Sequence, residues 1–85
     1  MLASDYRRFK AIHHLVVASG YETLQASLRA LELSLPELME VLHQIEWDNG
    51  DRLFTTENGI LHFTEIGSQR LTTWRHAIQS LGIAL

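Results

Sequence analysis

The segment from residue 34 to residue 46 holds the side chains whose chemistry is easiest to interpret. Its apolar residues are spaced for one buried helix face, which leaves His43 and Gln44 on the opposite side. Imidazole and carboxamide groups can hydrogen-bond to base edges, and a glutamate can accept a hydrogen bond from cytosine N4. However, Glu37 and Glu40 carry the same sign of charge as phosphate. The outward positions expected are Leu35, Met39, Glu40, His43 and Gln44.

The sequence contains no motif typical of a metal site, a phosphate-binding loop or a catalytic nucleophile. The five histidines include no pair four residues apart, and no histidine–carboxylate cluster has the spacing of metal ligands. There is no glycine-rich phosphate loop and no Gly-x-Ser-x-Gly turn. The chain has no cysteine, which excludes disulfides and cysteine-ligated zinc. We therefore expect neither enzymatic activity nor a cofactor or metal.

The elements that must position the 34–46 segment follow from caps and apolar spacing. The first helix is expected after Ser4 or Asp5 and is ended by Gly20, and the second is expected to begin at Thr23. Ser34 and Glu37 form a capping-box pattern for the third helix. That helix is expected to end near Glu46, followed by the stop signal Asp48-Asn49-Gly50.

Two short strands and a last helix complete the pattern. The runs 53–55 and 60–63 predict strands, joined by a hairpin turn at Asn58-Gly59. Thr64 is expected to cap the last helix, and Gly82 to end it. The order predicts a mostly α fold with a small β-wing, a winged helix-turn-helix followed by a linker or dimerisation helix. We expect residues 1–64 to form the winged helix-turn-helix and residues 65–85 to form the linker or dimerisation helix, within one compact unit.

Size and charge limit the remaining possibilities. The chain has 85 residues and a net charge of −3, whereas a small domain that neutralises phosphate is usually basic. Its basic cluster, Arg7, Arg8 and Lys10, either lies along a phosphate backbone or is a solvated helix start. No apolar run approaches the roughly 20 residues of a membrane span, and the first residues of the sequence do not have the pattern expected of a secretory signal. We expect a cytoplasmic location.

The sequence resembles the N-terminal DNA-binding domain of LysR-type transcriptional regulators over roughly residues 9–81. The order and spacing of four motifs carry the resemblance: Ser34-x-Pro36-x-Leu38, Leu42-x-x-Ile45-Glu46, Arg52-Leu53-Phe54 and Phe63-Thr64-Glu65-x-Gly67. Most departures fall where DNA contact is expected, at Leu35, Glu37, Met39 and Thr56. The family also has a ligand-binding domain after the linker helix. The chain ends at Leu85, either as a standalone domain or as part of a longer protein.

The resemblance implies a DNA-binding transcriptional regulator that acts as a homodimer on double-stranded DNA. The alternative is a degenerate winged helix that binds protein, pairing with or antagonising another regulator, because its third helix is acidic. Residues expected to contact DNA are Ser34, Leu35, Met39, Glu40, His43, Gln44, Arg52, Thr56, Asn58, Arg7, Arg8 and Lys10.

The last helix has an apolar stripe with no further chain to cover it, which favours pairing with a copy of itself or with another protein. Trp74 is expected in the core or in the dimer seam, and Trp47 is expected to pack under the wing. Residues expected in the seam are Ile66, Leu71, Trp74, Ile78 and Leu81.

Overall fold

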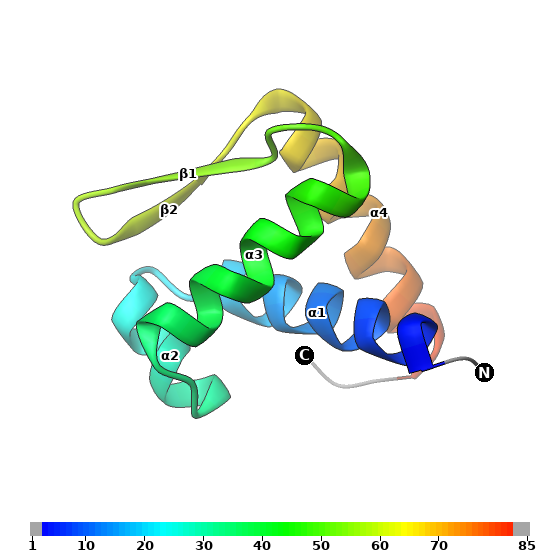
Figure 1. The fold of residues 1–85 in the computed structure, drawn as a ribbon, viewed down its shortest axis with the longest axis horizontal. Helices are drawn as coiled ribbons and strands as arrows, with labels where there is room; N and C mark the ends of the chain where they lie inside the picture. The colour runs from blue at the N-terminus through cyan, green and yellow to red at the C-terminus, as the bar shows by residue number, and fades with distance from the viewer. Residues whose placement is uncertain (1–2, 83–85) are drawn as a thin grey trace.

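The computed structural model describes residues 3–82, so the outermost residues of the expected domain ranges, 1–2 and 83–85, lie outside it. Helices α1 (Ala3–Ser19), α2 (Leu24–Leu31) and α3 (Leu35–Asn49) are followed by strands β1 (Phe54–Glu57) and β2 (Ile60–Phe63) and by helix α4 (Glu65–Ser80). In Figure 1 the hairpin lies along one side of α3, and α1 lies along the other. The expected mostly α fold with a small β-wing is confirmed.

Local capping explains most helix boundaries. The Thr23 hydroxyl accepts a hydrogen bond from the Ala26 N–H, and the Thr64 hydroxyl accepts one from the Gly67 N–H. At α3 the capping box is complete, because Ser34 and Glu37 each accept a bond from the other's backbone N–H. At the start of α1 the prediction was wrong: the helix begins at Ala3, so Ser4 and Asp5 lie within it.

Helix α3 is three residues longer than predicted, and this changes the place of Trp47. The helix ends where Gly50 adopts a left-handed conformation with φ of 72°. Because the chain is still helical at Trp47, this side chain lies roughly 200° around the axis from the buried Ile45. Trp47 is 83% exposed, so the prediction that it packs under the wing was wrong.

The hairpin forms with the predicted turn and second strand, although β1 spans Phe54–Glu57 rather than residues 53–55. Asn58 and Gly59 both have positive φ, which a two-residue turn of this type requires. The Gly59 carbonyl oxygen accepts a hydrogen bond from the Leu24 N–H at 3.0 Å. This bond joins the tip of the wing to the first residue of α2, so the hairpin is held at both ends.

A second connection holds the base of the wing to α4. The Thr64 hydroxyl donates to the Arg52 carbonyl, and the Thr64 N–H donates to the Leu53 carbonyl. Gly67 approaches Leu53 so closely that a Cβ at this position would overlap the Leu53 carbonyl oxygen. The Thr64-x-x-Gly67 spacing therefore serves a packing purpose.

The core lies between the helices and the base of the wing. Leu15, Leu38, Leu42 and Leu53 are at most 1% exposed. Helix α4 packs on α1, and Ile78 is only 2% exposed. The expectation that the last helix has no chain to pack against was therefore wrong, and Ile78 is not available to a seam. Among the described residues, no helix is both long and apolar enough to cross a membrane.

Candidate nucleic-acid interface

One row of side chains on α3 runs from the edge of the core to the exposed side of the helix. Leu38, Leu42 and Ile45 are buried, whereas the residues four apart from Leu35 onward turn progressively away from them, so that Trp47 lies farthest from the buried side. We call this row the outer ridge: Leu35, Met39, His43 and Trp47.

Each end of the outer ridge is exposed, and its middle is anchored. Met39 is half-buried and packs against the core, and the His43 ring stacks on Phe54 of β1 with centroids 6.4 Å apart. Leu35 is 47% exposed and Trp47 is 83% exposed. Shallow hollows lie on both sides of Trp47, one reaching Met39 and Glu40 and the other reaching Arg52 at the start of the wing.

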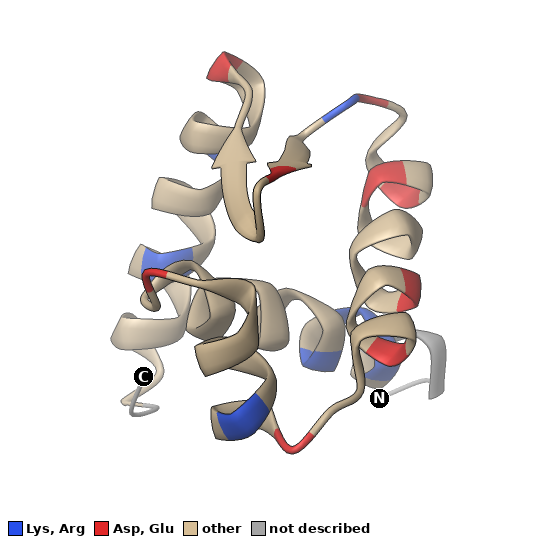
Figure 2. Cartoon of the chain, turned by 90° about the vertical axis from the view of Figure 1, so that its left-hand side faces the viewer, with Lys and Arg blue, Asp and Glu red and all other residues tan. Residues whose placement is uncertain are grey.

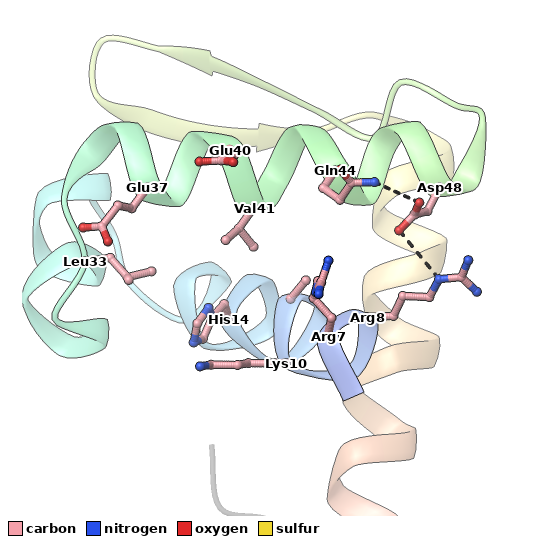
Figure 3. A pocket seen from close by; sticks show the side chains of 11 residues that line it. Arg7, Arg8, Lys10, His14, Leu33, Glu37, Glu40, Val41, Gln44 and Asp48 are labelled. Atoms are coloured by element: carbon pink, nitrogen blue, oxygen red, sulfur yellow. Dashed lines mark hydrogen bonds and ion pairs between the residues drawn. The ribbon is translucent and has the colours of Figure 1, made fainter. Parts of the chain in front are cut away.

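A groove of about 610 Å³ separates α3 from the first half of α1. Figure 3 shows Arg7 and Lys10 on its α1 edge, with Glu37 and Glu40 on its α3 edge. Thus the two charged sets that the sequence placed far apart lie on opposite sides of one groove. The groove brings the expected basic cluster next to α3, but it also brings that cluster next to carboxylates.

Hydrogen bonds and ion pairs constrain several of these groups. The Arg8 Nε lies 3.9 Å from Asp48 Oδ2, and Gln44 donates from Nε2 to Asp48 Oδ1 at 3.0 Å. Because Arg8 is exposed, this ion pair contributes little to stability. It nevertheless directs one of the three clustered cations toward a carboxylate.

Glu46 has an internal role. Its carboxylate accepts hydrogen bonds from the Leu53 N–H at 2.8 Å and the Phe54 N–H at 3.4 Å. These bonds fix the turn between α3 and β1, and so they set where the wing begins. The glutamate of the Ile45-Glu46 motif is therefore a positioning group for the hairpin.

Two titratable groups have shifted pKa values for clear reasons. Desolvation by burial, followed by the charges of Lys10 and His13, lowers the pKa of His14. Hydrogen bonds from the backbone and the side chain of Ser34 lower the pKa of the Glu37 carboxyl group. The lowered pKa favours the uncharged form of His14 in the groove at neutral pH, while Glu37 stays ionised.

The expected DNA-contacting residues fall into three groups around α3. Leu35, Glu40, His43 and Gln44 are exposed on α3 itself, and Arg52, Thr56 and Asn58 are exposed on the wing side. Exposed Arg7, Arg8 and Lys10 lie across the groove, and the Ser34 hydroxyl is used in the cap. Trp47 was not among the residues expected on the outward side of the third helix. Continuing the helical spacing of residues as far as the stop signal at Asn49-Gly50 would have placed it there.

Charge on α3 is of one sign. Its 15 residues include four carboxylates and no lysine or arginine. Figure 2 shows red bands toward both ends of this helix and no blue along it. With Glu46 hydrogen-bonded to the wing backbone, the outward carboxylates are those of Glu37, Glu40 and Asp48.

The three helices, the hairpin and the final helix together define a winged helix-turn-helix. The chain is similar in structure to the LysR family transcriptional regulator CbnR, with a TM-score of 0.78 and 19% identity over 87% of this chain. It is equally similar to the protein in the CbnR_DBD–DNA complex, with a TM-score of 0.77, 19% identity and coverage of 87% of this chain and 85% of that chain.

These likenesses confirm the predicted fold. The match covers 26% of the CbnR chain, so this chain spans about a quarter of that regulator's length. No protein-family model and no curated protein matches the sequence.

Proposed function

We propose that this chain is a DNA-binding module of a transcriptional regulator and acts as a dimer. The observation that carries the proposal is its fold: α3 presents an exposed side next to a hairpin, as part of the framework shared with the protein of a DNA complex. A helix of this size fits the major groove, where side chains can reach base edges.

In this proposal each of the three groups around α3 has one role. His43, Gln44 and Glu40 read base edges, with Leu35 and Met39 in apolar contact beside them. Cations and polar groups that flank α3 bind the DNA phosphates on the two sides of the major groove. On the wing side these are Arg52, Thr56 and Asn58, and on the other side they are Ser34 at the helix start with Arg7, Arg8 and Lys10.

The test is titration of labelled random-sequence duplex DNA at low salt. We expect affinity to fall with added salt, because each phosphate contact releases counterions. Each contact contributes about −0.9 to the slope of the logarithm of the binding constant against the logarithm of the salt concentration. Replacing Arg52 by alanine should reduce the magnitude of the slope by about one unit. The control is Arg29→Ala, which removes an exposed cation on α2 outside the proposed interface. Absence of binding at low salt would contradict the proposal.

Dimerisation through α4 uses the residues that the core leaves exposed. Ile66 is 43% exposed and Leu81 is 67% exposed, at opposite ends of the helix, whereas Leu71 and Trp74 are half-buried. Antiparallel pairing about a two-fold axis places Ile66 of one copy beside Leu81 of the other, and the reverse. The half-buried residues then border the contact.

We expect Leu81→Asp to shift the protein toward monomer, because a carboxylate would be buried in the apolar contact. Sedimentation velocity over a range of protein concentrations measures the shift. Tyr21→Asp is the matched control, since Tyr21 is 43% exposed between α1 and α2. A wild-type protein that stays monomeric at all concentrations would rule out this dimer.

A further inference from the structure

The outer ridge has the composition of a protein interface. Tryptophan and methionine are enriched at such interfaces, and an exposed tryptophan is a frequent anchor of binding energy. Trp47 has the largest exposed fraction among the large hydrophobic side chains of the described residues. It has hollows on both sides, into which the side chains of a partner can pack.

The charge beside the ridge indicates which partner fits. Glu40 borders both the hollow next to Trp47 and the groove toward α1, and Glu37 and Asp48 lie on the same groove edge. Like charges make this edge unfavourable for phosphate, whereas a cationic partner gains both attraction and faster association.

A second copy of this chain is a poorer match for the same edge. The whole chain has a net charge of −3. Two copies would therefore bring like net charges together, and a different, positively charged protein fits this edge better.

We propose that the outer ridge is a docking surface for a cationic amphipathic helix of another protein. The apolar side of that helix packs on Trp47 and Met39, and its lysines or arginines lie against Glu40 and the acidic groove edge. Ridges of one helix pack between side-chain rows of another, which suits a single row at four-residue spacing. This inference goes beyond DNA binding, and because α3 serves both, the two ligands exclude each other.

The first experiment uses a fluorescently labelled synthetic peptide of about 18 residues, or five helical turns. The peptide has leucines on one side and lysines at both borders, and binding is measured by anisotropy. We expect saturable binding that Trp47→Ala weakens by about ten-fold or more, as for an interface anchor. Because Trp47 is exposed, circular dichroism should show that this variant is folded. Tyr21→Ala, a truncation of an exposed aromatic side chain between α1 and α2, is the matched control and should bind normally.

Two comparisons make the result decisive. A peptide of the same composition in scrambled order should bind at least several-fold more weakly, because it keeps the charge and loses the apolar side. Glu40→Gln should weaken peptide binding and tighten binding of random-sequence DNA in parallel titrations, because the carboxylate attracts the cationic peptide and, where no matched cytosine faces it, repels phosphate. Glu40 is chosen over Glu37 because Glu37 belongs to the capping box.

The proposal is overturned if the ordered peptide does not bind, if the scrambled peptide binds equally well, or if Trp47→Ala has no effect. Failure of the DNA proposal has a separate signature. In that case the peptide binds and responds to Trp47→Ala, while duplex DNA shows no binding at low salt. Binding of DNA with no peptide binding removes the docking proposal alone.

Discussion

Replacing Gly67 by alanine is expected to destabilise the protein strongly. The added Cβ would overlap the Leu53 carbonyl oxygen, which belongs to the backbone and so cannot move as a side-chain end can. Overpacking of this kind typically costs about 1–3 kcal/mol, and more where backbone must shift. Moving Leu53 would also strain its hydrogen bonds to Glu46 and Thr64. We expect a loss of about 3 kcal/mol or more, which corresponds to roughly 10–25 °C in melting temperature.

Thermal unfolding followed by circular dichroism measures this effect. Gly20→Ala is the matched control, because the same methyl group meets only the Val17 carbonyl at an ordinary 3.4 Å and φ is not positive there. Its effect on the free energy of unfolding should stay within about 1 kcal/mol. Equal melting temperatures for Gly67→Ala and the wild type would show that α4 does not approach the wing base as described.

Replacing Leu42 by alanine should cost about 2–5 kcal/mol of unfolding free energy, because it leaves a cavity in the core. Leu42 is fully buried in the cluster formed by α1, α2, α3 and the start of the wing. The matched control on the same helix is Leu35→Ala, whose side chain is 47% exposed and whose effect should be within about 0.5 kcal/mol.

Urea denaturation of the two leucine variants gives both free energies. Leu35 and Leu42 lie seven residues apart on nearly the same side of α3, so the pair compares the exposed start of the helix with its buried middle. A result in which Leu35→Ala is the more damaging would mean that the core contacts the start of α3 rather than its middle. The pair of variants therefore tests the packing of α3 independently of any ligand.

The two proposals differ in what they require of α3. DNA binding requires that its polar groups reach base edges while flanking cations offset its carboxylates. Docking requires the carboxylates themselves, together with Trp47. The opposite effects expected for Glu40→Gln on the peptide and on random-sequence DNA follow from this difference, because the Glu40 carboxylate attracts a cationic peptide and repels phosphate.

Local structure could be predicted from the sequence because its causes are local. A hydroxyl three residues before an N–H is enough to begin a helix, as at Thr23, Ser34 and Thr64. Asn58-Gly59 is enough to specify a tight turn, since both residues tolerate positive φ. The order of these elements then limits the fold to a winged helix-turn-helix.

Only the tertiary structure decided which surfaces remain exposed. Because α3 continues to Asn49, Trp47 lies within the helix and is exposed. The packing of α4 on α1 buries Ile78 and so removes it from any dimer seam. Residues far apart in the chain decided the rest: the contact between Gly67 and Leu53, the bond from Leu24 to Gly59, and the groove that opposes Lys10 to Glu40. Such contacts depend on how whole elements pack, and residue spacing along one element contains no information about its distance from another.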